Sequence, residues 1–261
     1  MNVLSEIIAR KRERLAEAKA LIGLDKLRQD ALAKRRDSTP HALRHALQGE
    51  GVNIIAEFKR RSPSKGIIRA GADLQSIVRS YEAGGAVALS VLTEEDYFDG
   101  SLDDLGAAKK SVALPVLRKD FVFDEYQIFE AATAGADAVL LIVAALDDRQ
   151  LASLRRLAED ELEMDALVEV HEPYEMDRAV KSGATIIGVN NRNLKTFEVS
   201  LETSVQLAPL APRGALLVSE SGLNEAADLR RLREQGFHGF LIGETLMRAR
   251  DPEQALRDLR S

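Results

Sequence analysis

Residues 54–66 read IIAEFKRRSPSKG, an apolar run that ends in an acid and a base and then breaks into a turn of Ser, Pro and Gly. Successive side chains of a strand point to opposite faces, so Glu57 and Lys59 share a face while Phe58 points away from it. A carboxylate and an ammonium at the C-terminal end of a hydrophobic strand suit a catalytic pair. An isolated pair is more often a surface ion pair, so the interpretation depends on whether such strand ends recur.

Further apolar runs of strand length follow, uninterrupted as in strands that are covered on both faces. With the first run, the expected strands are Val52–Phe58, Ala86–Leu92, Leu114–Leu117, Ala138–Val143, Ala166–Val170, Thr185–Val189, Ala215–Val218 and Gly239–Ile242. Helical stretches lie between them, and several end at glycine, which suits a left-handed C-cap. Examples are Leu74–Ala83, Asp124–Ala134, Asp147–Leu162, Pro173–Lys181 and Asn224–Gln235.

Eight such units in a chain of 261 residues predict an α/β fold, a (β/α)8 TIM barrel. We disfavour an open doubly wound sheet because no Gly-rich dinucleotide turn follows the first strand. A single domain is expected over residues 1–261, and residues 1–50 form an N-terminal helical extension. Its helical pieces, Val3–Lys19, Leu24–Arg36 and His41–Leu47, are too short and charged to hold a core of their own. We expect the extension to pack on the barrel and to cover the catalytic mouth.

Composition argues against several classes of function. The chain has no Cys, which excludes disulfides, thiolate nucleophiles and Cys-ligated metals and fits a reducing cytoplasm. Near the N-terminus acids are interleaved with the bases, as in Arg10–Lys19, and there is no Trp, so nucleic acid is not an expected partner. The longest apolar run, Ala138–Leu146, is too short to span a bilayer. We therefore expect a cytoplasmic protein that does not associate with membranes.

Chemistry-bearing residues recur at the C-terminal ends of the expected strands, where barrels build their active sites. Each alone could be a helix cap or a surface ion pair, but several converging on one mouth indicate a site. In chain order they are Glu57 and Lys59, Lys119 and Phe121, Glu169, Asn190 and Arg192, Glu220 with Ser221 and Gly222, and Gly243 with Glu244.

Two lysines and three carboxylates in one mouth of low dielectric would shift one another's pKa values, which is how acids and bases are poised near neutrality. The glycines that follow the last two strands lie where barrels commonly hold a phosphate. These two features predict a phosphorylated substrate and acid–base chemistry in several steps. An imine to either lysine is conceivable, but lysines flanked by acids are more typical of proton donors.

Metal binding is not expected. The chain has only four histidines, and His41, His45 and His238 lie away from the predicted catalytic ends. The fourth, His171, follows Glu169 without the surroundings of a ligand cluster, so we interpret it as a turn residue or a neighbour of the site.

These motifs resemble the blocks of the indole-3-glycerol phosphate synthase family, in order and over nearly the whole chain. AEFKRRSPS at 56–64 is similar to the family's first signature, and the opening Val3–Lys11 to its N-terminal helix. The later blocks are LRKDF at 117–121, LVEVH at 167–171, GVNNRNL at 188–194, SESG at 219–222 and LIGETLM at 241–247. The SPS and NNRNL blocks are specific to this family among phosphate-binding barrels.

The resemblance implies a reaction of tryptophan biosynthesis that needs no cofactor. 1-(2-Carboxyphenylamino)-1-deoxyribulose 5-phosphate would cyclise with loss of carbon dioxide and water to indole-3-glycerol phosphate. Lys119 would be the general acid on the substrate carbonyl, with Glu57 as the partner that orients it. Lys59 and Glu169 would serve the later proton transfers.

The same resemblance implies binding roles. Asn190 and Glu220 would hold substrate hydroxyls and the lysines, Phe121 would form a wall for the aromatic ring, and Arg192 would meet an anionic group. The phosphate and the adjoining part of the substrate would be bound by Ser62, Ser221, Gly222, Gly243 and Glu244.

Two alternatives stay open. One is another phosphate-binding barrel of the pathway, such as a phosphoribosylanthranilate isomerase. The other is a catalytically silent barrel that only binds a phosphometabolite. Two lysines with carboxylate partners favour the synthase over both. A monomer is expected, and contact with neighbouring enzymes of the pathway is left open.

Overall fold

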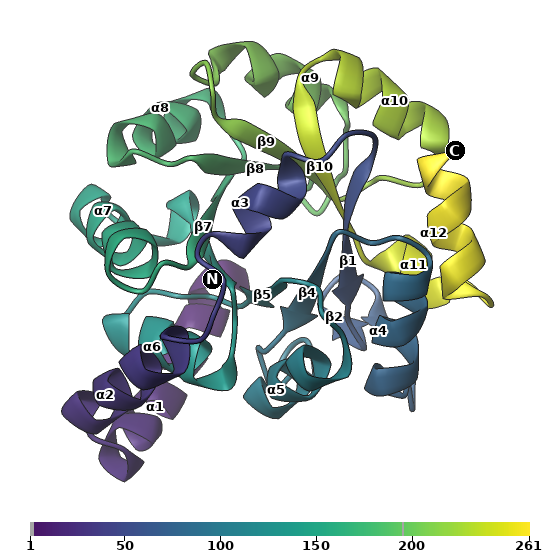
Figure 1. Ribbon diagram of the computed structural model, residues 1–261. Coiled ribbons are helices and arrows are strands. Elements are labelled where there is room, and N and C mark those ends of the chain that lie inside the picture. The colour runs from purple at the N-terminus through teal and green to yellow at the C-terminus, as the bar shows by residue number, and fades with distance from the viewer. Residues whose placement is uncertain (1–2, 195) are drawn as a thin grey trace.

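The computed structural model describes residues 3–194 and 196–261 and contains a closed, eight-stranded parallel barrel, which confirms the predicted fold (Figure 1). Pairing of the last strand with the first closes the sheet and excludes the doubly wound alternative. The barrel strands are β1 (Asn53–Phe58), β4 (Ala88–Leu92), β5 (Val116–Lys119), β6 (Ala138–Ile142), β7 (Asp165–Val170), β8 (Ile186–Asn190), β9 (Leu216–Glu220) and β10 (Phe237–Ile242). A separate hairpin, β2 (Arg61–Ser62) with β3 (Gly66–Ile67), forms at the predicted turn.

Helices cover the outside of the barrel. They are α4 (Leu74–Ala83), α5 (Leu102–Ser111), α6 (Glu125–Ala134), α7 (Asp148–Arg156), α8 (Pro173–Ser182), α9 (Glu202–Leu207), α10 (Ala226–Glu234), α11 (Glu244–Arg248) and α12 (Pro252–Arg260). Short turns η1 (Val143–Ala145), η2 (Leu157–Glu161) and η3 (Ala208–Leu210) extend the connections. Gly135 and Gly183 end α6 and α8 at φ values of 93° and 83°, the left-handed C-caps that the sequence predicts.

Side chains of the barrel strands alternate between two cores. On β1, Ile54 and Ala56 belong to the outer core between strands and helices, while Ile55 belongs to the core inside the barrel. The inner core is apolar towards the N-terminal ends of the strands. The inward positions nearest the C-terminal ends are therefore where polar side chains can gather.

The N-terminal extension meets both ends of the barrel. Its helices are α1 (Val3–Leu21), α2 (Leu24–Arg35) and α3 (Ala42–Leu47), and α3 lies across the N-terminal ends of the strands (Figure 1). Leu43 and Leu47 of α3 pack into the inner core, where they close that mouth. Tyr126 of α6 donates to the carbonyl of Ala18, which holds α1 beside the barrel. The part of the extension that borders the cavity at the C-terminal mouth is the start of α1. Helix α3 lies at the opposite mouth, so the extension as a whole does not cover the catalytic one.

Within residues 3–194 and 196–261, no helix combines the length and the apolar character that crossing a membrane requires.

Candidate active site

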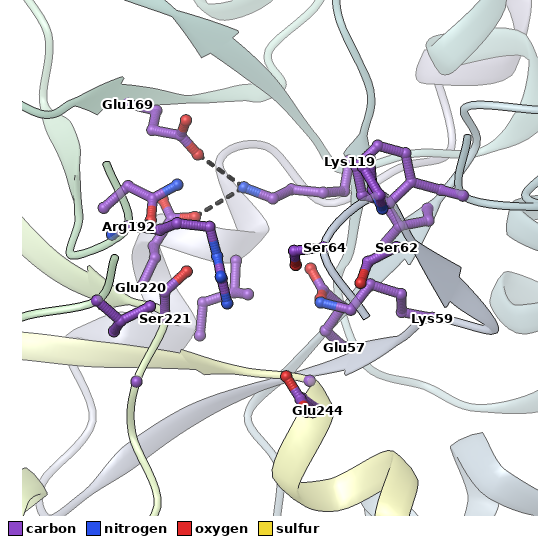
Figure 2. Close-up of a pocket in the computed structure, with 18 of the residues that line it drawn as sticks. Glu57, Lys59, Ser62, Ser64, Lys119, Glu169, Arg192, Glu220, Ser221 and Glu244 are labelled. Carbon is purple, nitrogen blue, oxygen red and sulfur yellow. Dashed lines mark hydrogen bonds and ion pairs between the residues drawn. The ribbon is translucent and has the colours of Figure 1, made fainter. Parts of the chain in front are cut away.

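A cavity of about 740 Å³ opens at the C-terminal ends of the barrel strands (Figure 2). Its walls come from the start of α1, the β2–β3 hairpin and the loops that follow the strands. Every residue that the sequence predicts for the site lines this cavity, namely Glu57, Lys59, Ser62, Lys119, Phe121, Glu169, Asn190, Arg192, Glu220, Ser221, Gly222, Gly243 and Glu244.

Lys119 is the centre of one cluster of charges. Its Nζ donates to Glu169 Oε2 at 2.8 Å and to Glu220 Oε2 at 2.7 Å (Figure 2). The three residues come from β5, β7 and β9, which alternate around the barrel. Inward side chains of alternate strands share a layer in such barrels, which brings the three to one level.

Lys59 and Glu57 form the second cluster. Lys59 Nζ donates to Glu57 Oε1 at 2.6 Å, and Ser90 Oγ lies 3.4 Å from Glu57 Oε2. The expectation that Glu57 is the direct partner of Lys119 therefore needs correction. Lys59 comes directly after β1, two residues beyond Glu57, and pairs with the Glu57 carboxylate, while Lys119 is held by two other carboxylates.

The charges of the first cluster set one another's protonation. Burial opposes the charge of Lys119, but Glu169, Glu220 and Glu57 outweigh burial and raise the Lys119 pKa above its usual value. Burial raises the pKa of Glu220 to about 7, and the neighbouring Glu169 adds to this effect. For Glu169 burial is outweighed by Lys119 and His171, which lower its pKa to about 2. Glu169 therefore stays ionised while Glu220 can exchange a proton near neutrality.

Two glycines leave room for the carboxylates. A Cβ on Gly188 of β8 would overlap Glu220 Oε1, and a Cβ on Gly243, directly after β10, would overlap Glu57 Oε1. From the sequence we expect Gly243 to let a phosphate approach the backbone. The structure gives a further reason for this glycine, because the nearest obstacle to a side chain is the carboxylate of Glu57.

Phe121 and Phe98 form an aromatic wall, with ring centroids 6.1 Å apart at an interplanar angle of 43°. Arg192 extends towards the middle of the cavity (Figure 2), and its Nη1 donates to the carbonyl of Phe197 at 3.2 Å. His171 adjoins the site as expected, with Nε2 3.4 Å from Glu169 Oε1.

Sequence reasoning missed several lining residues. Phe98 belongs to the loop after β4, one of the two strands at whose ends the sequence predicts no site residue; the other is β6. No strand-end rule points to Ser64 or to the loop after β8, and the missed residues from these segments are Ser64, Phe197 and Val199. Val3, Leu4 and Ile7 at the start of α1 also line the cavity, and they belong to the extension that we expect to cover the mouth.

No group of three or more His, Asp or Glu side chains in the described part of the chain is arranged to hold a metal ion.

Replacing Glu220 by glutamine should change how thermal stability depends on pH. The folded-state pKa of about 7 exceeds the ordinary 4.5, so the folded protein binds this proton more tightly than the unfolded chain does. The stability due to this proton is complete below the unfolded pKa and is lost as pH rises through about 7. The melting temperature of Glu220→Gln relative to wild type should therefore be higher at pH 8 than at pH 5. Calorimetry at both pH values measures it, and an unchanged difference would contradict the raised pKa.

Comparisons with known proteins agree with this geometry. A model of the family described as indole-3-glycerol phosphate synthase matches residues 4–259. Proteins named indole-3-glycerol phosphate synthase from Polaromonas sp. and Desulfotalea psychrophila are 48% and 47% identical to this chain, each over 99% of it and 98% of the relative. Among solved structures, 3-hexulose-6-phosphate synthase from Salmonella typhimurium has a TM-score of 0.65 at 14% identity over 80% of this chain and 97% of that one. At that identity the likeness shows the fold alone.

Proposed function

The chain belongs to the indole-3-glycerol phosphate synthase family, and from this we infer that it is a carboxy-lyase that makes indole-3-glycerol phosphate from 1-(2-carboxyphenylamino)-1-deoxyribulose 5-phosphate. The observation that carries the inference is the pair of ammonium–carboxylate clusters in one cavity, Lys119 with Glu169 and Glu220, and Lys59 with Glu57. The reaction must protonate the ketone oxygen twice, first to a hydroxyl and then to the water that leaves, and two lysines supply one proton each.

We propose that the substrate lies with its ring against Phe121 and Phe98 and with its phosphate among the loops after β9 and β10 and the β2–β3 hairpin. The ring then lies near Lys119, the last residue of β5, which Phe121 follows by two residues. Arg192 suits an anionic group of the substrate, and Asn190 suits a hydroxyl. No metal or organic cofactor is required, because the aryl amine supplies the electrons.

In the ring closure, the ring carbon that carries the carboxylate bonds to the ketone carbon. Lys119 donates a proton to the carbonyl oxygen, which becomes a hydroxyl. The carboxylate then leaves as carbon dioxide, and its bonding electron pair restores the aromatic ring. Glu169 and Glu220 hold the ammonium in place, and Glu220, whose pKa lies near 7, returns a proton to Lys119.

In the dehydration, we propose that Lys59 protonates the hydroxyl, which leaves as water. Glu169 accepts the proton that is lost from the adjacent methylene carbon as the indole double bond forms. Glu169 is a weak base while Lys119 is charged, since that charge lowers its pKa. Once Lys119 has given up its proton, this charge is gone and Glu169 becomes a stronger base.

The direct test is product formation by purified protein with the substrate, with a chelator present and no nucleotide added. The chain has no Trp, so indole fluorescence from the product appears against a low background. We expect one carbon dioxide for each indole formed. Binding of the substrate without product would favour the alternative of a catalytically silent barrel.

Inorganic phosphate should inhibit competitively, and Ser221→Gly should weaken the binding of both phosphate and substrate by roughly tenfold to a hundredfold, the loss of one hydrogen bond to a charged group. Ser221 has a φ of 68°, a conformation that glycine adopts without strain, so the change removes the hydroxymethyl group without disturbing the backbone. A substrate analogue without phosphate is the control and should be almost indifferent. Equal weakening of the substrate and of the analogue without phosphate would place the phosphate elsewhere.

We further propose that the protein acts as a cytoplasmic monomer, because one chain supplies both clusters and the walls of the cavity. Sedimentation at working concentration tests the oligomeric state, and a stable dimer would contradict it.

A further inference from the structure

Lys11 on α1 is a buried lysine that the proposed mechanism does not use. It is 5% exposed, although lysine is rarely buried unless it is paired. Its Nζ lies 2.8 Å from Asp120 Oδ2 and 2.8 Å from Glu95 Oε2. These two carboxylates come from different loops of the catalytic mouth.

Asp120 connects Lys11 to the end of β5. It stands between Lys119 and Phe121 in the chain, and its Oδ1 accepts from the backbone N–H of Phe121 at 2.8 Å. Its Oδ2 also accepts from Thr93 Oγ1 at 2.6 Å and from Arg118 Nη2 at 2.9 Å. The carboxylate therefore sets the position of the backbone from which both the proposed acid and the aromatic wall project.

Glu95 connects Lys11 to the loop that carries Phe98. The buried carboxylate of Glu94 organises this loop by accepting from the N–H groups of Asp96, Tyr97 and Phe98 at 3.1, 2.8 and 3.1 Å. Arg14, one turn after Lys11, adds a bidentate contact to Asp96 at 2.7 and 2.6 Å. Helix α1 thus holds the loop at two neighbouring carboxylates.

We propose that Lys11 is a positioning residue, which ties the Phe98 loop to the end of β5 and so keeps Phe98 and Phe121 together beside Lys119. Without its ammonium, Asp120 and Glu95 are two like charges brought close in a partly buried place, and they repel. Asp120 would still be paired with Arg118, so it would stay in place. The more exposed Glu95 would move away from it together with its loop. The inference rests on the proposed roles of Lys119 and Phe121.

The first test compares Lys11→Met with Lys19→Met. Lys19 lies on the same helix and pairs with Asp124 at 2.7 Å, but its side chain is 42% exposed and its partner is away from the cavity. We expect Lys11→Met to lower kcat/KM by roughly tenfold to a hundredfold, with a raised KM as well as a lower kcat. Lys11→Arg, which keeps the charge, should recover part of this loss, and Lys19→Met should stay within about twofold of wild type.

A second measurement follows the loop itself. Because the chain has no Trp, Phe98→Trp provides a single fluorescent reporter. In this background Lys11→Met should shift the emission to longer wavelength and increase quenching by acrylamide, and Lys19→Met should change neither. If Lys11→Met does not fold, Glu95→Gln removes one partner and should affect KM and the reporter in the same direction.

Lys11 would be only an anchor for α1 if Lys11→Met lowered the melting temperature and left kcat, KM and the reporter as in Lys19→Met. That result would overturn the inference, as would an unchanged Glu95→Gln protein where Lys11→Met fails to fold. A wild-type protein that forms no product contradicts the proposed function instead, and the reporter then still measures whether Lys11 holds the loop.

Discussion

Replacing Lys119 by alanine is expected to lower kcat at least about 10²-fold while the substrate still binds. Lys119 is the only lysine that two carboxylates of the cavity contact directly in the part of the chain that the structure describes. These contacts hold its ammonium in the cavity, where we propose that the ketone oxygen lies. Single-turnover kinetics, with substrate binding measured separately, checks the prediction. Near-normal turnover in the alanine variant would remove Lys119 from the role of acid.

The arginine variant separates proton donation from charge. Removing the ammonium leaves Glu169 and Glu220 buried next to each other, which by itself is destabilising. Lys119→Arg keeps a positive charge between them, but a guanidinium hardly gives up its proton near neutrality. We expect this variant to be more stable than Lys119→Ala and still to turn over slowly. Recovery of activity by arginine would show that the charge alone is what the reaction needs.

The location of the site could be predicted from the sequence because of one property of the fold. The parallel strands of a barrel all end at the same mouth, so a residue such as Glu169 can be assigned to the site from its place after an apolar run. The same rule assigns Lys119, Asn190 and Glu220. These residues are far apart in the chain, and all four line one cavity.

The contacts within the site could not be predicted in the same way. The pairing of lysines with carboxylates depends on the stagger of the strands and on the reach of each side chain. A local sequence motif determines neither of these. Glu57 was expected to meet Lys119, but Lys59 reaches it first. Likewise, the sequence of residues 41–47 indicates a helix, but it does not indicate which mouth of the barrel this helix closes.

The structure also gives a role to Gly188, which sequence reasoning passed over. On β8, between β7 and β9, this glycine leaves a gap in the inner lining of the barrel. Glu220 Oε1 occupies the gap, and this buried oxygen accepts no hydrogen bond from the described residues. The gap therefore decides where the carboxylate of Glu220 lies and lets its other oxygen reach Lys119.

Gly188→Ala should accordingly lower kcat strongly and the free energy of unfolding only slightly. The obstacle to the new methyl group is the end of a flexible side chain, so Glu220 can swing away at little cost in folding free energy. Its carboxylate would then leave Lys119, and a misplacement of about 1 Å in a catalytic group can lower kcat on the order of 10²-fold. Steady-state kinetics together with thermal melting measures the two effects side by side.

Gly106→Ala on α5 is the matched control. An added Cβ there comes no closer than 3.8 Å to Ala134 O, and alanine in place of glycine inside a helix favours folding. It should leave kcat unchanged and raise the melting temperature slightly. If Gly188→Ala instead lost stability and activity in proportion, the glycine would serve packing of the strands. If it kept full activity, Glu220 would not need its present position, and the proton that we assign to it would have to come from another group.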